Sequence, residues 1–324
     1  MFVSKTPFRI SFFGGGTDLP SFYEQNGGCV VSSSIDKHIY LSINKQFRTK
    51  GFNLKYSTNE FAKKIESIQH PIIKEVFKKF RINNVVLSSI ADLPSNSGMG
   101  SSSSFTVGLV NLCSLFADST ILDKEQLSEE ACKIEIDLLK EPIGKQDQYA
   151  ASFGGFNRFH FNNDGSVDVE NLNLGPSSVK LEKNLMLFHL GGSRRASSIL
   201  KDQNEKIKTD NYAIENSTHL RNIAKDFCLK KLKKNIDYFG ELLNENWLFK
   251  KKISNRISSE FIDQFYEDAI SSGAIGGKLL GAGGAGFFLL YVREKDQMKV
   301  KKKLSEFYLE NFKFENHGSI VQKL

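Results

Sequence analysis

A loop rich in serine and glycine, from Pro94 to Ser104, is the feature that most constrains this chain. It leads directly into an apolar segment that predicts a helix from about Ser101 to Phe116. Gly98 and Gly100 allow a positive φ and a close approach of the backbone to a ligand. Free N–H groups and the helix dipole favour an anion at such a helix start, so the loop indicates a phosphate site.

The loop alone leaves two interpretations open. It lacks the lysine of a Walker A loop, which requires G-x-x-x-x-G-K-[ST], and a serine-capped helix after a turn is a common structural motif. Under the phosphate interpretation, the residues expected to contact a nucleotide form one continuous run: Ser95, Asn96, Ser97, Gly98, Met99, Gly100, Ser101, Ser102 and Ser103.

A second glycine-rich segment, Gly281 to Gly286, matches G-x-G-x-x-G but not the context of that motif. The dinucleotide-binding fingerprint needs a strand before it and a helix after it. Here the pattern predicts a helix, about Ser259 to Ser272, before the glycines and a strand, Phe287 to Val292, after them. We therefore expect these glycines to let two backbone segments pack closely, either bracing the serine-rich loop or touching its ligand.

Two carboxylates suit the transfer of a phosphoryl group to a hydroxyl. Asp147 follows a turn at Pro142 and Gly144, a rigid place for a group that accepts or orients a hydroxyl proton. An N-cap for a helix starting at Gln148 is the structural alternative. Glu135 lies one position from an apolar helix stripe, where it would hold Mg²⁺ if half-buried and be an ordinary surface glutamate otherwise.

A third candidate cluster joins Arg9 to the segment from Gly14 to Asp18. Three consecutive glycines remove side chains from a wall, and the Asp18 carboxylate could accept sugar hydroxyls there. A hairpin turn is the alternative. The candidate substrate-binding residues of this segment are Gly14, Gly15, Gly16, Thr17 and Asp18.

Composition narrows the classes of protein that fit. The chain has 324 residues and a net charge of +7, carried partly by lysine runs in helix-like patterns that favour solvated faces over nucleic-acid binding. No apolar run approaches the ~20 residues of a membrane span, and the N-terminus lacks a secretory pattern, so we expect a cytoplasmic protein without membrane contact. The lysine runs that carry part of the positive charge are Lys230–Lys234, Lys250–Lys252 and Lys299–Lys303.

The four cysteines form no C-x-x-C pair and indicate reduced thiols.

Local patterns predict an α+β arrangement in both halves of the chain. Two strands, Cys29–Ser34 and His38–Ile43, are expected to meet at a turn at Asp36-Lys37, and Val85–Ala91 is a further strand. Helices are predicted over residues 60–80, 123–140 and 295–310, and a helix-rich stretch over 195–272. We place a domain boundary near residue 180, giving domains of residues 1–180 and 181–324.

Three motifs, in this order, together resemble the GHMP kinase superfamily, which includes galactokinase, homoserine kinase and mevalonate kinase. The second motif is similar to the family's P-x-x-x-G-L-G-S-S-S, with Met99 in place of leucine. The resemblance covers nearly the whole chain and is much more specific than any single motif. The motifs are Pro7–Asp18, Pro94–Ser104 and Lys278–Gly286.

Two segments, Arg9–Pro20 and Gln146–Asn157, resemble the branch that contains the D-glycero-D-manno-heptose 7-phosphate kinases; a kinase acting on fucose is a neighbouring branch. Galactokinase-like members carry Glu-His where this chain has Gly15-Gly16. That departure argues against galactose and leaves room for a larger sugar.

The resemblance implies a first domain with a ribosomal-protein-like fold and a left-handed βαβ crossover, a ferredoxin-like second domain, and ATP in the cleft between them. It implies phosphate contacts for Ser101 and Ser102, Mg²⁺ at Ser102 and Glu135, and a catalytic role for Asp147 assisted by Arg9. A substrate phosphate needs a basic anchor, for which we favour Arg194, and Gly283 is a further candidate substrate contact.

The expected activity is ATP-dependent phosphorylation of the anomeric hydroxyl of a heptose 7-phosphate, with Mg²⁺ as cofactor and a small-molecule sugar phosphate as partner. Two alternatives stay open: a kinase of an unphosphorylated sugar such as fucose, and a non-catalytic sensor of the same fold. A monomer or a homodimer is expected, without nucleic acid.

Overall fold

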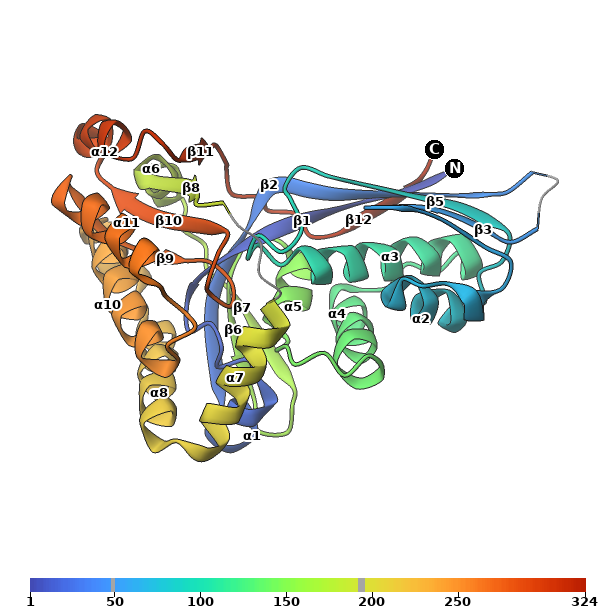
Figure 1. Cartoon of the computed structure of the whole chain (residues 1–324), viewed down its shortest axis with the longest axis horizontal. Helices are drawn as coiled ribbons and strands as arrows, with labels where there is room; N and C mark the ends of the chain where they lie inside the picture. Colours follow the sequence, from blue (N-terminus) through green and yellow to red (C-terminus); the bar gives the residue numbers. More distant parts are fainter. Residues whose placement is uncertain (48–49, 192–195) are drawn as a thin grey trace.

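The computed structural model describes residues 1–47, 50–191 and 196–324. Within them, two sheets organise the chain (Figure 1). The larger has the order β12-β1-β2-β5-β3-β4, with β6 beside β2 and β7 beside β6; the smaller has the order β11-β8-β10-β9. The strands of the larger sheet are β1 Phe2–Phe13, β2 Gly28–Lys45, β3 Phe52–Lys55, β4 Asn59–Ala62, β5 Val85–Ala91, β6 Phe156–Phe161, β7 Val167–Asn171 and β12 Ile320–Lys323; those of the smaller are β8 Leu185–His189, β9 Ala274–Leu279, β10 Phe287–Val292 and β11 Tyr308–Glu310.

Helices cover both sheets. The apolar helix α3 packs on β1 and β2, and α10 packs on β9, while α8 also reaches β2 from the second half of the chain. The described part of the chain contains no helix with the length and apolarity of a membrane span. The α-helices are α1 Pro20–Asn26, α2 Pro71–Lys79, α3 Ser101–Asp118, α4 Lys124–Cys132, α5 Gln146–Phe153, α6 Ser177–Asn184, α7 Ala196–Thr209, α8 Asn211–Asp226, α9 Leu229–Lys234, α10 Tyr238–Ile253, α11 Glu260–Ser271 and α12 Gln297–Lys303; short 3₁₀ turns lie at Ile65–Ser67 and Glu294–Asp296.

The predicted turn at Asp36-Lys37 is wrong. Strand β2 runs through these residues without reversing, and its pairing with β1 only shifts register between Pro7 and Phe8. The Asp36 backbone N–H donates to the Lys313 carbonyl, and the Asp36 side chain accepts from the Lys313 N–H. The C-terminal segment therefore satisfies the backbone at the irregularity, and the strand continues past it.

Two predicted helices are shorter than expected. Over residues 60–80 the helix begins only at Pro71, because proline lacks the N–H that a preceding turn would need and restrains His70 to an extended conformation. The helix predicted near 295–310 is confined to α12 and its 3₁₀ turn, and β11 follows it. Strands β5 and β10 have the predicted limits, and α7 to α11 confirm the helix-rich stretch from residue 196 onward.

The segment after α4 departs from a regular helix in a way that matters for the site. Asp123 caps α4 through the predicted capping box with Gln126, but residues Lys133–Leu138 form a π-helix, in which the Leu139 N–H donates to the Ile134 carbonyl. The wider turn shifts the register of the helix faces. As a result Leu138, expected in the apolar stripe, is exposed and Glu135 is buried.

The glycine-rich segment Gly281–Gly286 joins two strands of one hairpin. We predicted a helix immediately before it, but β9 lies between α11 and the glycines. Since β9 and β10 pair antiparallel on either side, the segment is a hairpin loop and no helix follows it. A strand does precede the glycines, as the dinucleotide-binding fingerprint requires, but the helix that must follow them is missing. The segment is therefore not that fingerprint, as predicted, although only one of the two reasons given for the prediction is correct.

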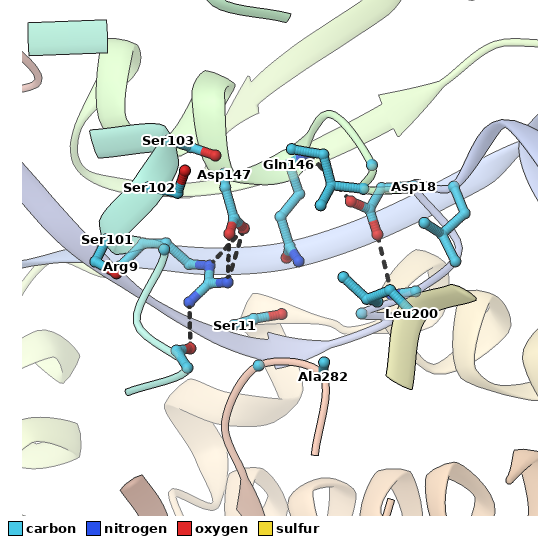
Figure 2. A pocket seen from close by; sticks show the side chains of 18 of the residues that line it. Arg9, Ser11, Asp18, Ser101, Ser102, Ser103, Gln146, Asp147, Leu200 and Ala282 are labelled. Atoms are coloured by element: carbon cyan, nitrogen blue, oxygen red, sulfur yellow. Dashed lines mark hydrogen bonds and ion pairs between the residues drawn. The ribbon is translucent and has the colours of Figure 1, made fainter. Parts of the chain in front are cut away.

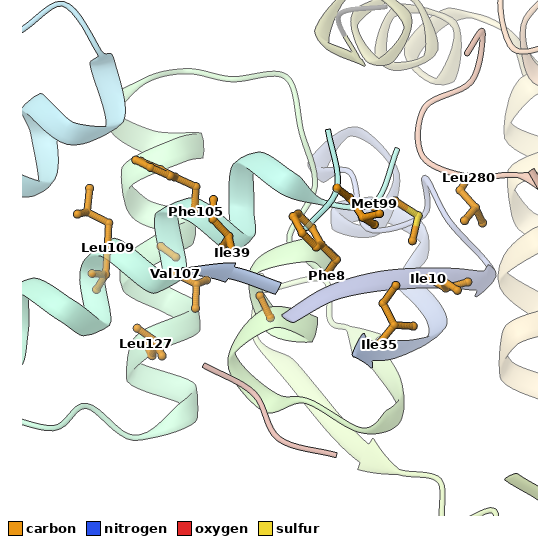
Figure 3. Close-up of a cluster of buried hydrophobic side chains, with 14 of the residues drawn as sticks. Phe8, Ile10, Ile35, Ile39, Met99, Phe105, Val107, Leu109, Leu127 and Leu280 are labelled. Atoms are coloured by element: carbon orange, nitrogen blue, oxygen red, sulfur yellow. The ribbon is translucent and has the colours of Figure 1, made fainter. Parts of the chain in front are cut away.

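The hydrophobic core ties this hairpin loop to the serine-rich loop. Phe8 and Ile10 of β1 are fully buried, and Met99 of the serine-rich loop and Leu280 beside the hairpin glycines lie in the same cluster (Figure 3). Both loops are thus anchored in one core and present their remaining residues to a common cleft.

Candidate active site

A cavity of about 440 Å³ opens where the serine-rich loop, the Gly14–Asp18 segment, α5 and the hairpin loop meet (Figure 2). It brings together most of the residues singled out from the sequence. The predicted residues that line it are Arg9, Gly15, Gly16, Asp18, Asn96, Gly98, Gly100, Ser101, Ser102, Ser103, Glu135 and Asp147.

The other predicted residues support the wall or lie outside the described residues. Met99 is in the core, and its carbonyl accepts from the Arg9 N–H at 3.2 Å. The Thr17 hydroxyl donates to the Gly14 carbonyl at 2.9 Å, which closes that turn. Gly283 lies against the Ile257 backbone rather than the cavity. The predicted residues absent from the lining are Ser95, Ser97, Met99, Gly14, Thr17 and Gly283; Arg194 falls within residues 192–195, which the structure does not describe.

The serine-rich loop and the hairpin loop touch through their glycines, as the bracing interpretation predicts. Gly98 has φ 82°, and a Cβ on it would lie 2.4 Å from the Leu280 carbonyl oxygen. A Cβ on Gly281 would lie 2.6 Å from the Gly98 Cα. Only glycine permits this approach, which fixes the loop at the start of α3, and the first residues of that helix line the cavity.

Arg9 and Asp147 form the central ion pair of the cavity. The Arg9 Nε and Nη2 donate to the two Asp147 carboxylate oxygens, each at 2.8 Å, and Nη1 donates to the Gly98 carbonyl at 2.7 Å. Arg9 is buried. Asp147 lies in the first turn of α5, whose N-cap is Lys145, so the N-cap alternative for Asp147 is wrong. The guanidinium fork fixes the carboxylate and links it to the serine-rich loop.

Glu135 is buried beside the start of α3. Its carboxylate accepts from the Ser102 hydroxyl at 2.8 Å and from the Gln148 side-chain amide at 2.6 Å. Burial raises the pKa of Glu135, and hydrogen bonds from Ser103, Ser102, Gln148 and Thr106 oppose that rise. The surface-glutamate alternative is therefore wrong.

A divalent cation fits the donors at this point. Glu135 makes no ion pair within the described ranges, so its carboxylate is held only by neutral donors. Those ranges also contain no group of three or more His, Cys, Asp or Glu side chains able to hold a metal. One carboxylate and one hydroxyl suit Mg²⁺, which usually completes its shell with water and substrate phosphate oxygens.

Asp18 closes the opposite end of the cavity. Its carboxylate accepts from the Gly16 N–H at 3.0 Å and the Gln146 N–H at 3.2 Å. Burial raises the pKa of Asp18, and the charge of Asp147 raises it further. A Cβ on Gly144 would lie 2.1 Å from an Asp18 oxygen, so the glycine of the predicted turn also makes room for this carboxylate.

Sequence reasoning missed two buried lysines that line the cavity. We expected Lys250 on a solvated face, but it is 6% exposed; its ammonium donates to the Gly15 carbonyl at 2.9 Å and to the Gln203 side chain at 3.2 Å. Burial lowers the pKa of Lys250 to about 8, against an opposing effect of Asp18. The signal was available in the helical spacing, because Lys250 falls on the same face of α10 as Leu243 and Trp247.

Lys278 is the second missed lysine. It is buried in β9, and its ammonium donates to the Ser11 carbonyl at 2.7 Å. Burial lowers the pKa of Lys278, and the charges of Lys250 and Arg9 lower it further. Two signals were available in the sequence: Lys278 is a single lysine inside an otherwise apolar strand, and it opens the third motif, Lys278–Gly286.

Comparison with known proteins agrees with this geometry. The family model for the GHMP kinase N-terminal domain matches residues 61–155, and that for the C-terminal domain matches residues 224–310. Together they span more than half of the chain. Such a phosphate loop, paired with a positioned carboxylate, defines a phosphotransferase site. The chain belongs to the GHMP kinase family, and it is a kinase as predicted.

Individual relatives match most of this chain. The chain is 28% identical to a D-glycero-alpha-D-manno-heptose 7-phosphate kinase of Campylobacter jejuni, over 97% of both chains. It is 25% identical to a bifunctional fucokinase/GDP-fucose pyrophosphorylase of Arabidopsis thaliana, matching 93% of this chain and 31% of that protein. A solved structure described as a D-glycero-D-manno-heptose 1-phosphate kinase, from Bacteroides thetaiotaomicron, superposes with a TM-score of 0.81 at 24% identity, covering 100% of this chain and 99% of that one.

The predicted two-domain α+β fold is confirmed, and family membership implies ATP as the phosphoryl donor. The boundary near residue 180 stays a prediction. Strands of the larger sheet come from both ends of the chain, because β12 pairs with the first residues of β1.

Proposed function

We propose that this kinase transfers the γ-phosphate of ATP to the anomeric hydroxyl of D-glycero-D-manno-heptose 7-phosphate. The product would be the 1,7-bisphosphate, a precursor of nucleotide-activated heptose for surface polysaccharide. The observation that carries the chemistry is the convergence of the Arg9–Asp147 pair and the Ser102–Glu135 pair on one cavity. The 28% identity to a heptose 7-phosphate kinase over 97% of both chains supports the choice of acceptor.

Asp147 would accept or orient the proton of the attacking hydroxyl. Each of its oxygens accepts one hydrogen bond from Arg9, and each keeps a lone pair for a further donor. Arg9 holds the carboxylate in place and would stabilise negative charge beside the attacking oxygen. Neither group has to move between binding and transfer.

The nucleotide phosphates would lie at the start of α3. Ser101, Ser102 and Ser103 of its first turn line the cavity there, and the N–H groups of a helix start and the serine hydroxyls are suited to phosphate oxygens. Glu135 and Ser102 would hold Mg²⁺, which supplies charge neutralisation to the transferred phosphoryl group when bound. The sugar would contact the Gly14–Asp18 segment, with Asp18 accepting hydroxyls. Gly283 and Arg194 remain predictions for contacts with the substrate.

A second candidate is a kinase of an unphosphorylated sugar such as fucose. Its support is the 25% identity to the fucokinase-containing protein, which matches 93% of this chain. The sensor alternative has less support, because both carboxylates expected of an active kinase are buried or paired in the cavity.

An assay of ADP release separates these candidates. Purified protein with ATP and Mg²⁺ is offered heptose 7-phosphate, sedoheptulose 7-phosphate, fucose, galactose, mevalonate and homoserine in parallel. We expect turnover with heptose 7-phosphate well above all others. Turnover only with an unphosphorylated acceptor would refute the proposal, and no turnover with any of them would favour the sensor.

A further inference from the structure

Two buried cations lie on the side of the cavity formed by β9, α10 and the Gly14–Asp18 segment. Lys250 and Lys278 both line the cavity, and each ammonium donates only to uncharged oxygens. Neither forms an ion pair within the described residues. Taking an ammonium out of water without a counter-ion costs several kcal/mol. Two such groups side by side are consistent with a site built for an anion.

Asp18 offsets only part of this positive charge. Its carboxylate acts on Lys250 but makes no ion pair with it, and its oxygens accept from the Gly16 and Gln146 backbone N–H groups. Two further carboxylates of the cavity have their own donors, Asp147 from Arg9 and Glu135 from Ser102 and Gln148. Glu141 also lines the cavity, but it is exposed to solvent.

Gln203 adds an unused donor at the same place. It lies on α7, is fully buried, and its side-chain N–H₂ group has no hydrogen-bond partner, although its oxygen accepts from Lys250. A Cβ on Gly16 would lie 2.3 Å from that nitrogen and 2.9 Å from the Lys250 ammonium. The absence of a side chain at Gly16, which lines the cavity, therefore makes room for both donors directly beside the wall, where galactokinase-like sequences carry a histidine.

Lys250 contacts the segment that we propose holds the sugar. Its ammonium donates to the Gly15 carbonyl, and the Asp18 carboxylate acts on it. Arg9 pairs with Asp147 at the transfer point, whereas Gly15 follows the end of β1 at Phe13. Lys250 therefore lies beside the part of the wall that would face the body of the acceptor rather than its reacting hydroxyl.

We propose that Lys250, with Gln203 beside it and Lys278 adding positive potential, binds the phosphate group that the acceptor already carries. This inference rests on the proposed function, because it assigns a binding subsite to the acceptor of the same reaction. A sugar without that phosphate would leave the Lys250 ammonium without an anion to bind, so this subsite would select phosphorylated over unphosphorylated acceptors.

The first test is the ratio of kcat/KM for heptose 7-phosphate to kcat/KM for the same heptose without phosphate. We expect Lys250→Met to reduce this ratio roughly 10- to 100-fold, the range for losing a charged hydrogen bond, and Gln203→Met to reduce it less. Lys252→Met is the matched control, since Lys252 is exposed on the same helix. Equal losses with both acceptors, or an unchanged ratio in a folded Lys250→Met protein, would overturn the assignment, as would a collapse of the ratio in Arg194→Ala alone.

The second test does not need turnover. Binding of inorganic phosphate is measured by calorimetry with the nucleotide site saturated by a non-hydrolysable ATP analogue. We expect binding in the unmodified protein and in Lys252→Met, and its loss in Lys250→Met and Gln203→Met. That result would support the subsite even if heptose 7-phosphate is not the acceptor. Equal phosphate binding by all four proteins, or by none, would overturn it.

Discussion

The buried charged groups in two parts of the cavity differ in the partners that they have. On one side Asp147 and Glu135 are both oriented by hydrogen bonds, one from a bidentate arginine and one from neutral donors. On the other side Lys250 and Lys278 are bound only to uncharged oxygens, and the Gln203 nitrogen has no partner. A preorganised side is suited to chemistry, since its groups are already oriented. A side with unmatched charge is suited to recognising a charged ligand.

The largest effect should come from the preorganised side. Asp147→Asn removes the proton acceptor, and an amide cannot accept from Arg9 at both of its atoms. We expect kcat to fall by about 10³-fold, within the range for general base catalysis, with ATP affinity nearly unchanged. Steady-state kinetics and nucleotide titration check this result.

Asp137→Asn is the matched control for that variant, because Asp137 is exposed and does not line the cavity. Its kcat should equal that of the unmodified protein. Near-normal turnover in Asp147→Asn would remove Asp147 from its proposed role and with it the distinction between the two sides.

Glu135→Gln should have the next largest effect, expressed through the metal. The amide keeps the approximate shape but loses the charge that Mg²⁺ needs. We expect the Mg²⁺ concentration for half-maximal activity to rise roughly 10- to 100-fold, the range found when groups around a metal are changed. Glu129→Gln, an exposed change in α4, is the control. An unchanged Mg²⁺ dependence would contradict the metal assignment.

The two parts of the cavity also differ in how many of their residues could be predicted from the sequence. Ser101, Ser102 and Gly100 are contiguous, and Asp147 follows a local turn, so short-range patterns sufficed to find them. The burial of Glu135 depends on a π-helix that no local sequence pattern indicated. The subsite around Lys250 joins α7, α10 and the Gly14–Asp18 segment, which are far apart in the chain, and its lysine was concealed within a run of three.

The fold likewise contains elements that local patterns predict and elements that depend on long-range contacts. Strands β5 and β10 were predicted with their observed limits, since each is a β-branched or apolar run bounded by turn residues. The continuation of β2 through Asp36 could not be predicted, because a segment nearly 280 residues later satisfies its backbone. Long-range hydrogen bonds of this kind leave no periodic signal.

The contact that joins the two halves of the cavity gives a third prediction. In Gly98→Ala the new methyl group would meet the Leu280 carbonyl oxygen at 2.4 Å, and φ is already 82°. We expect a loss of about 2–4 kcal/mol in unfolding free energy and a higher Michaelis constant for ATP.

Gly175→Ala separates the effect of backbone strain from the effect of the close contact with Leu280 in Gly98→Ala. Gly175 also has a positive φ, but nothing lies within 4 Å of its Cβ position. Its loss should be about 1 kcal/mol, from backbone strain alone. If denaturant unfolding gives equal losses for both variants, the close packing of the two loops contributes nothing.

The smallest effect is a pH dependence at the lysine side. The pKa of Lys250 is lowered to about 8, so the ammonium is charged below that pH and neutral above it. Asp18 opposes this shift, while burial and nearby cations also lower the pKa of Lys278. We expect kcat/KM for a phosphorylated acceptor to fall by up to about tenfold per pH unit above 8, since kcat/KM reports groups of the free enzyme.

Lys250→Arg provides the comparison, because arginine stays protonated throughout this range. Its profile should remain flat to a higher pH. A flat profile in the unmodified protein between pH 7 and 9.5, or the same fall in Lys250→Arg, would show that the charge of Lys250 does not bind the acceptor.

The central claim is that this kinase adds a second phosphate to a sugar that already bears one. The most direct measurement is a ³¹P NMR spectrum of heptose 7-phosphate after incubation with the protein, ATP and Mg²⁺. We predict a new resonance, coupled to the anomeric proton and equal in intensity to the original phosphate signal of the converted sugar. No new sugar-phosphate resonance, under conditions where an unphosphorylated heptose or fucose is converted, would contradict the account.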